Sequence, residues 1–293
     1  MKQNKNLLHM LWTVALVVCV ALSILALGIS ACSKQDGGEK EKTTGKGGFT
    51  VESAPPETVK PSEDPVPAEE TPPIETTAPT PTPVSVRLGE TPDAGRAYLD
   101  KIIFLGDSTT YGIGAYYGWG YTELCPPSQV WTPASGTLTL SYYNIATIVY
   151  PETKEELSIE EAVKRAKPEI MVITLGVNGI SFMDEEWFIR DYTALVKLIQ
   201  EASPDTKIIL NSIYPVAASY KYQKDINNER IRAANGWIER IATDTGVRFL
   251  NSYECLVGPD GNLPEVSQNG DGLHLNGESF TTVMQYIRTH AYT

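Results

Sequence analysis

Four short apolar runs alternate with helical patterns in the C-terminal part of this 293-residue chain, and this alternation limits the possible folds more than any other feature. The runs cover residues 101–105, 169–175, 207–213 and 247–250. Their apolar residues largely follow one another instead of alternating with polar ones, which is typical of strands buried on both faces of a parallel sheet. Because helices cover both faces of such a sheet, the sequence predicts an α/β fold: a three-layer α/β/α sandwich with a mostly parallel sheet.

Three helices are predicted between these runs. Ser158 and Glu161 form a capping box, which indicates a helix that ends before Pro168. Two longer segments have apolar side chains at steps of three and four residues, as expected of helices packed on a sheet. These side chains are Phe188, Tyr192, Leu195, Val196 and Ile199 in one segment, and Ile231, Ala234, Ile238 and Ile241 in the other.

Residues 1–31 have the features of a targeting segment. Lys2 and Lys5 precede an apolar run over residues 11–29, which is long enough to cross a bilayer. The run ends in Ile-Ser-Ala-Cys, which resembles a bacterial lipobox and predicts lipidation of Cys32. An uncleaved signal anchor is the alternative. Both interpretations predict an extracytoplasmic chain that is anchored to the bacterial cell membrane by lipid or by its N-terminal segment.

Residues 32–94 differ from the rest of the chain in composition. Pro, Thr and Glu are abundant, apolar side chains are sparse, and no helical or strand period persists. Such a segment buries too little apolar surface to offset the conformational entropy of ordering, and its prolines favour an extended chain. We interpret residues 32–94 as a disordered linker that holds a folded domain, residues 95–293, away from the membrane. A proline-rich docking site is the alternative.

Charge and cysteine content exclude two classes of function. The formal net charge is −12, whereas a nucleic-acid-binding protein needs a basic surface. The cysteines, Cys19, Cys32, Cys125 and Cys255, form no CxxC or Cys/His cluster, so no structural zinc site is predicted. Cys125 and Cys255 could form a disulfide outside the cell, but free buried thiols are the expected state.

Ser108 is the candidate nucleophile. Ligands of parallel sheets bind beyond the carboxyl ends of the strands, and Ser108 directly follows the predicted strand over residues 101–105. At a strand-to-helix turn a serine hydroxyl lies beside backbone N–H groups and the positive end of the helix, which suits a nucleophile and the oxyanion that it generates. An ordinary helix N-cap is the alternative.

His274 is the candidate base, and Asp271 its orienting carboxylate. A serine nucleophile needs a base, and that base is usually held by a third group. Asp271 precedes His274 by three residues, so one turn of chain can join them. His9 lies in the targeting segment and His290 near the C-terminus, which makes both weaker candidates. A solvent-exposed loop without catalytic function is the alternative for Asp271 and His274.

Asn178 is a candidate oxyanion donor. It follows the predicted strand over residues 169–175, at the same edge of the sheet as Ser108. A side-chain amide at that edge can donate to an oxyanion. The Asn-Gly pair that it forms with Gly179 is also a strong turn signal, and an ordinary turn is the alternative.

Three motifs of the chain resemble sequence blocks of the SGNH/GDSL esterase-lipase family: Gly106-Asp107-Ser108, Gly176 with Asn178, and Asp271 with His274. The resemblance runs from about residue 101 to the C-terminus. It implies the flavodoxin-like SGNH hydrolase fold and a catalytic set of Ser108, Asp271 and His274. One departure is Gly179, which stands where the family usually has an aspartate.

The resemblance also implies an oxyanion hole with three donors. The Ser108 N–H and the Asn178 amide are two of them, with Gly176 supporting the turn that carries Asn178. The third is usually the N–H of a glycine after the second strand, which we place at residues 138–148. No glycine occurs there, so Ala146 is the tentative donor, and Gly136 is the alternative if the strand lies earlier.

The implied activity is that of a serine esterase without a metal or organic cofactor. We expect a monomer that hydrolyses O-acyl esters, acetyl esters above all, on envelope or environmental carbohydrates or on small molecules. A non-catalytic glycan-binding module and an O-acyltransferase on the same scaffold are alternatives. Four aromatic residues, Tyr116, Tyr117, Trp119 and Tyr121, either line the substrate site or pack a loop on the core.

Overall fold

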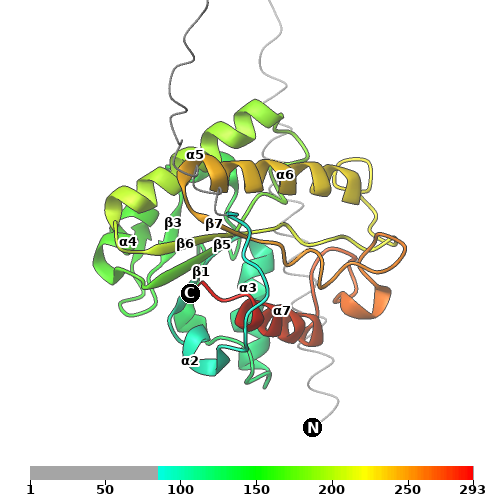
Figure 1. Ribbon diagram of the computed structural model, residues 1–293, viewed down its shortest axis with the longest axis horizontal. Coiled ribbons are helices and arrows are strands. Elements are labelled where there is room, and N and C mark those ends of the chain that lie inside the picture. Colours follow the sequence, from blue (N-terminus) through cyan, green and yellow to red (C-terminus); the bar gives the residue numbers. More distant parts are fainter. Residues whose placement is uncertain (1–84, 293) are drawn as a thin grey trace, which may run out of the picture. The chain divides into compact units, whose positions relative to one another are not determined.

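A parallel sheet lies at the centre of residues 85–292, the part of the chain that the computed structural model describes (Figure 1). It has five strands in the order β2-β1-β5-β6-β7, and every neighbouring pair is parallel. The strands are β1 (Ile102–Gly106), β2 (Val130–Trp131), β5 (Ile170–Thr174), β6 (Lys207–Asn211) and β7 (Arg248–Leu250). All four predicted apolar runs therefore form strands, and the predicted α/β class is confirmed.

Helices cover both faces of the sheet (Figure 1). One face carries α5 (Glu185–Ala202) and α6 (Asn228–Thr245), and α4 (Ile159–Ala166) packs beside α5. The other face carries α2 (Gly95–Leu99), α3 (Ser108–Gly118) and α7 (Gly277–Thr289). Alternate strand residues divide between two apolar cores, so that Leu105 joins the core under α5 and α6 whereas Phe104 joins the core under α3 and α7.

The predicted capping box opens α4. The Ser158 hydroxyl accepts a hydrogen bond from the Glu161 N–H at 3.2 Å, which satisfies one of the N–H groups that a helix start leaves without a partner. Lys167 has a left-handed backbone conformation and ends the helix one residue before Pro168. Local side-chain chemistry thus sets both ends of this helix.

The predicted position of the second strand, residues 138–148, is wrong. The strand next to β1 is β2, whereas residues 138–148 contain the 3-10 helix Leu140–Tyr142 and enter β3 (Thr147–Val149). The latter strand pairs antiparallel with β4 (Glu156–Ser158) in a separate two-stranded sheet. The error arises because Leu138, Leu140 and Ile148 are buried in the core without belonging to the central sheet.

The folded domain begins earlier than residue 95. The Leu88 N–H donates to the Phe249 carbonyl at 2.8 Å, and the Phe249 N–H donates to the Val86 carbonyl at 2.9 Å. Residues assigned to the linker thus pair with the otherwise open edge of β7. Residues 86–88 pair through backbone groups, and such a short pairing needs no apolar run. Composition alone therefore placed the boundary too late. Residues 1–84, with the predicted targeting segment and Cys32, lie outside the described residues.

No helix within residues 85–292 combines the length and the hydropathy that crossing a membrane requires.

Candidate active site

Ser108 lies at the junction of β1 and α3, as predicted. The strand ends at Gly106, the Asp107 side chain caps the helix, and Ser108 is the first helical residue. A Cβ atom at position 106 would lie 2.2 Å from the Thr174 carbonyl oxygen and 2.2 Å from the Thr110 hydroxyl oxygen. Only a glycine therefore lets β1 turn into α3 this close to β5. The Ser108 N–H is one of the N–H groups that lack an acceptor within the helix.

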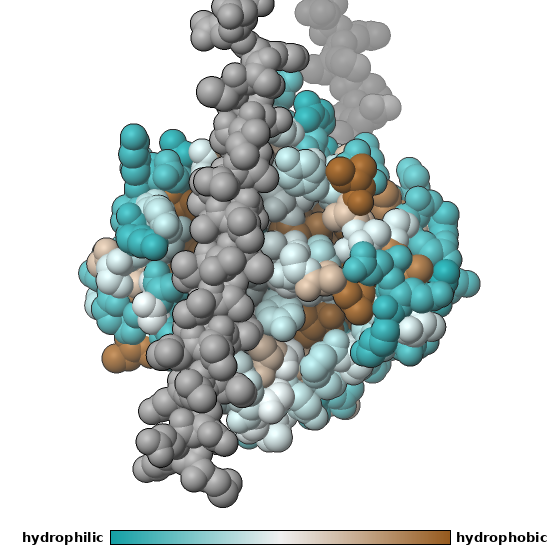
Figure 2. All heavy atoms as spheres, turned by 180° about the vertical axis from the view of Figure 1, so that it is seen from behind, coloured by the Kyte–Doolittle hydropathy of each residue, from teal (hydrophilic) through white to brown (hydrophobic). Residues whose placement is uncertain are grey.

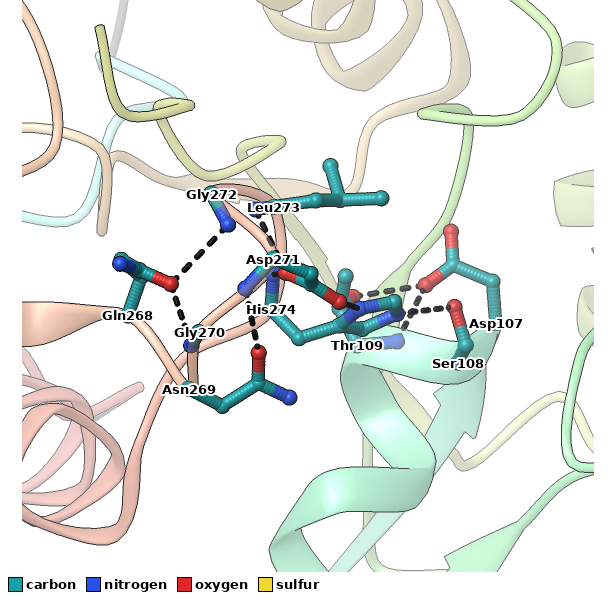
Figure 3. Close-up of polar contacts among 10 residues, drawn as sticks. All are labelled: Asp107, Ser108, Thr109, Gln268, Asn269, Gly270, Asp271, Gly272, Leu273 and His274. Atoms are coloured by element: carbon teal, nitrogen blue, oxygen red, sulfur yellow. Dashed lines mark hydrogen bonds and ion pairs between the residues drawn. The ribbon is translucent and has the colours of Figure 1, made fainter. Parts of the chain in front are cut away.

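The structure brings Ser108, His274 and Asp271 into one hydrogen-bonded series (Figure 3). Ser108 Oγ lies 2.8 Å from His274 Nε2, and His274 Nδ1 lies 2.6 Å from Asp271 Oδ2. A carboxylate at Nδ1 favours the tautomer with hydrogen on Nδ1, which leaves Nε2 as the acceptor for the serine proton. The His274 ring is buried, with 5% of the residue exposed, so solvent competes little for either bond.

The loop around Asp271 fixes the carboxylate. Asp271 Oδ1 accepts from the N–H groups of Leu273 at 2.8 Å and His274 at 2.9 Å, while Oδ2 faces the imidazole (Figure 3). Burial alone would raise the pKa of Asp271, but the hydrogen bonds and charge of His274 and the backbone N–H groups bring this pKa below its usual value. The carboxylate is therefore ionised at neutral pH, as an orienting partner of imidazole must be.

Gly272 allows this loop to reach the neighbouring connection. Its φ is +82°, and a Cβ atom there would lie 2.7 Å from the Cα atom of Tyr220. Gln268 Oε1 accepts hydrogen bonds from the N–H groups of Gly270 and Gly272 (Figure 3). The loop is thus held on both sides of Asp271.

Asp107 is a second, fully buried carboxylate beside the nucleophile. It accepts hydrogen bonds from the Thr109 N–H at 2.9 Å and the Thr109 hydroxyl at 2.6 Å, and also from the Gly176 N–H. Burial raises the pKa of Asp107 to about 6, against the opposing effect of these hydrogen bonds and of His274. The side chain joins the nucleophile turn to the loop that carries Asn178. Sequence reasoning treated Asp107 only as part of a motif, although its position before a helix indicated a cap.

Asn178 lies in the connection after β5, at the carboxyl edge of the sheet, as predicted. Gly176 begins this connection with φ +128°, and the Gly179 N–H closes a turn on the Gly176 carbonyl at 2.8 Å. The Asn178 amide donates from Nδ2 to the Thr137 hydroxyl oxygen at 3.2 Å. Thr137 follows β2, and no sequence pattern indicates it because β2 has only two residues.

The structure does not support Ala146 as an oxyanion donor. Its N–H donates to the Tyr142 carbonyl at 2.9 Å, within a turn that follows the 3-10 helix Leu140–Tyr142. Gly136, the alternative, does follow β2, but its N–H donates to the Pro133 carbonyl at 2.8 Å. In this conformation both backbone N–H groups are engaged with the protein itself. The prediction of Ala146 failed because it rested on the misplaced second strand.

The aromatic residues after the nucleophile pack on the core. The Tyr116 ring meets those of Trp119, Tyr121 and Phe280 at centroid distances of 4.9, 5.6 and 5.8 Å. The cluster fills the space between the C-terminal half of α3 and α7, as part of the core on that face of the sheet. It therefore supports the packing interpretation over that of a substrate wall.

Exposed aromatic side chains occur on other connections instead. Tyr111 stands on the first turn of α3, Phe182 on the connection from β5 to α5, and Tyr222 on that from β6 to α6. Their exposed fractions are 38%, 43% and 41%. All three segments follow carboxyl ends of strands, which is the edge that carries Ser108.

Neither cysteine of the described domain forms a disulfide. Cys125 is buried and Cys255 is half-buried, and burial raises the pKa of each thiol to about 12, which makes both unreactive at neutral pH. Among residues 85–292, no three His, Cys, Asp or Glu side chains gather closely enough to hold a metal ion.

Comparison with solved structures finds distant similarity to several hydrolases and transferases. A GDSL-like lipase from Bacteroides thetaiotaomicron VPI-5482 is 19% identical, with 64% of this chain and 85% of that chain covered and a TM-score of 0.45. The periplasmic domain of a lipopolysaccharide acetyltransferase from Salmonella ser. Paratyphi A is 17% identical, with coverages of 69% and 84% and a TM-score of 0.44. A carbohydrate esterase family 3 protein from Talaromyces cellulolyticus is 18% identical, with coverages of 64% and 93% and a TM-score of 0.41. At this distance the similarities indicate no substrate.

Comparison by sequence identifies the family. No curated protein is similar enough to this chain to count as a match. The profile of the GDSL-like Lipase/Acylhydrolase family matches residues 104–279, which is more than half of the chain and includes Ser108, Asn178 and His274. The chain therefore belongs to the GDSL-like lipase/acylhydrolase family and is a serine hydrolase that acts on ester bonds.

Proposed function

We propose that the chain removes small O-acyl groups, acetyl above all, from carbohydrates outside the cytoplasmic membrane, with Ser108 as the nucleophile. The observation that carries the proposal is the hydrogen-bonded series from Ser108 through His274 to Asp271. In that series a hydroxyl, a base and an orienting carboxylate occupy the order that acyl transfer to serine requires.

The chemistry follows from this geometry. His274 Nε2 takes the proton of Ser108 Oγ as the oxygen attacks the ester carbonyl carbon. The carbonyl oxygen becomes an oxyanion, which accepts hydrogen bonds from the Ser108 N–H and the Asn178 amide. His274 then gives its proton to the leaving alcohol, and the acyl group stays on Ser108. A water molecule, deprotonated by His274, attacks the acyl-enzyme. The bond from the acyl carbon to Ser108 Oγ then breaks, and His274 returns the proton to Ser108 Oγ as the acid leaves.

One feature supports a carbohydrate as the alcohol part of the substrate. Exposed aromatic rings stand on segments that follow the carboxyl ends of strands, as Ser108 does, and such rings suit the apolar faces of sugars. On the face drawn in Figure 2, hydrophobic side chains lie among hydrophilic ones where described residues are visible. The extracytoplasmic location rests on the targeting segment and lipobox predicted from residues 1–32.

The decisive experiment compares the full chain with its Ser108→Ala variant on p-nitrophenyl acetate and on an O-acetylated polysaccharide. We expect both substrates to release acetate, and the variant to lose roughly 10³-fold or more of kcat. Equal turnover by the two proteins would refute the role of Ser108. Release of p-nitrophenol without acetate, with the acetyl group transferred to an added glycan instead of to water, would refute hydrolysis and identify an acyltransferase.

A further inference from the structure

We propose that Thr137 is a positioning residue, which anchors the Asn178 amide in place as a donor to the oxyanion. This inference rests on the proposed function of Ser108 and Asn178. It concerns the second-strand connection, where neither Ala146 nor Gly136 offers a donor in this conformation.

The contact itself holds the amide in a fixed position. Asn178 Nδ2 lies 3.2 Å from Thr137 Oγ1. An amide nitrogen carries two hydrogens, so it can donate to the Thr137 hydroxyl and to a substrate oxygen at the same time. A hydroxyl can accept from the amide nitrogen or donate to the amide oxygen, whereas an oxyanion only accepts and therefore requires the orientation in which Nδ2 faces it. The Thr137 hydroxyl thus anchors the amide, and in the observed orientation one Nδ2 hydrogen is left for the oxyanion.

Both partners of this hydrogen bond are themselves held in place. The Ser135 hydroxyl donates to the Thr137 carbonyl at 3.3 Å, and the next residue, Leu138, is only 1% exposed in the core. On the other side, the Ser181 hydroxyl donates to the Asn178 carbonyl at 3.2 Å. A bond between two anchored segments constrains the amide more than a bond to a mobile loop would.

Strand order places this bond around the nucleophile. Thr137 follows β2, Ser108 follows β1 and Asn178 follows β5, and β1 lies between the other two strands in the sheet. The contact between Thr137 and Asn178 thus joins the two connections that flank the connection carrying Ser108.

Loss of one donor should strongly weaken stabilisation of the oxyanion, because few donors remain. The N–H groups of Gly136 and Ala146 both donate to protein carbonyls, so of the candidate donors the Ser108 N–H and the Asn178 amide remain for the oxyanion. Removal of one oxyanion donor costs roughly 10²–10³ in kcat. Without the Thr137 hydroxyl, the Asn178 amide is still there but is in place to donate for only part of the time. The loss of this hydroxyl should therefore lower kcat, by less than the loss of the amide does.

The test compares Thr137→Val, which keeps the shape but removes the hydroxyl, with Thr137→Ser, which keeps the hydroxyl. On p-nitrophenyl acetate we expect Thr137→Val to lower kcat by about tenfold, below the roughly 10²–10³ of Asn178→Ala, with little change in KM. Thr137→Ser should restore most of the rate. In the Asn178→Ala background, Thr137→Val should have no further effect, because Thr137 acts through that amide.

Three results would overturn the proposal: an unchanged kcat for Thr137→Val, an equal loss for Thr137→Ser, or additive effects with Asn178→Ala. Circular dichroism of each variant separates loss of fold from loss of rate, and the double variant decides the matter even where Thr137→Val is less stable. Full turnover by Ser108→Ala would refute the proposed function and this inference with it. Loss of turnover in Ser108→Ala, with no effect of Thr137→Val, would refute the positioning role alone.

Discussion

At the scale of single residues, Asp107 is the least expected member of the site. Its carboxylate is fully buried one residue before the nucleophile, and it binds both Thr109 and the Gly176 N–H. Burial raises the pKa of Asp107 to about 6, whereas an unfolded chain has an aspartate pKa of about 4. The folded protein therefore binds this proton more tightly than the unfolded chain, so the stability contributed by this group falls as pH rises from about 4 to about 6.

This difference predicts a pH-dependent effect of Asp107→Asn. The variant lacks the titration, so its free energy of unfolding relative to wild type should be higher at pH 7.5 than at pH 4.5, by up to roughly 2 kcal/mol. Urea unfolding of both proteins at the two pH values measures it, and the other titrating groups cancel because both proteins contain them. The same difference between variant and wild type at both pH values would show that Asp107 does not titrate in this range.

Asp271 offers a prediction about orientation instead of charge alone. In Asp271→Asn the side-chain oxygen can still accept from the Leu273 and His274 N–H groups, which keeps the loop folded. The amide nitrogen then faces His274 Nδ1 and favours the tautomer that cannot accept the Ser108 proton. We expect kcat on p-nitrophenyl acetate to fall by roughly 10³–10⁴. A fall of less than tenfold would mean that His274 does not need this carboxylate.

At the scale of elements, the sequence predicted the features that depend on local chemistry. Apolar runs identified β1, β5, β6 and β7, and the capping box of Ser158 and Glu161 identified the start of α4. The site residues Ser108, Asn178, Asp271 and His274 were predictable because each follows a recognisable strand or forms a short local motif. The structure places them at one edge of the sheet, and their catalytic roles await the variants described here.

The features that were missed depend on contacts between distant segments. The strand β2 consists of Val130 and Trp131 alone, and two residues produce no period. With β2 misplaced, the connection that contains Thr137 could not be identified as part of the site. The pairing of Val86 and Leu88 with β7 is also invisible in sequence, because it uses backbone groups that every residue carries.

That edge pairing gives a prediction for the boundary of the domain. Deletion of residues 85–94 removes four backbone hydrogen bonds, two with Phe249 and one each with Thr289 and Arg288, and the ion pairs of Arg87 with Glu239 and of Asp93 with Arg288. We expect the free energy of unfolding to fall by about 4 kcal/mol, at about 1 kcal/mol for each lost backbone hydrogen bond, with a smaller effect of the exposed ion pairs. Urea unfolding measures the loss. Deletion of ten residues from the predicted linker, 65–74, is the matched control and should change nothing.

At the scale of the whole domain, surface apolar side chains are distributed unevenly. Within residues 85–292, the large hydrophobic side chains that are exposed stand either on the first turn of α3 or on connections that follow a strand of the central sheet. These residues are Tyr111, Tyr142, Ile145, Phe182, Tyr222 and Val266. Exposure of apolar area costs free energy unless a ligand covers it, so this distribution favours a substrate larger than the acyl group alone.

Two exposed aromatic residues can test whether the substrate is larger than the acyl group, because each contacts a segment that carries a site residue. Phe182 lies in the same turn as Asn178, and its N–H donates to the Gly179 carbonyl. The Tyr222 ring packs on Tyr220, whose backbone touches the Gly272 loop. We expect Phe182→Ala and Tyr222→Ala to raise KM for an O-acetylated polysaccharide by about three- to tenfold, as loss of about 1 kcal/mol of stacking would, with no change for p-nitrophenyl acetate.

Tyr292 provides the matched control. Its ring lies within 5.0 Å of Lys207 Nζ, at the amino end of β6 and therefore at the opposite edge of the sheet. Tyr292→Ala removes an aromatic ring of the same size and should leave KM for both substrates unchanged. If Phe182→Ala and Tyr222→Ala also left KM for the polysaccharide unchanged, the aromatic edge would not contact the carbohydrate.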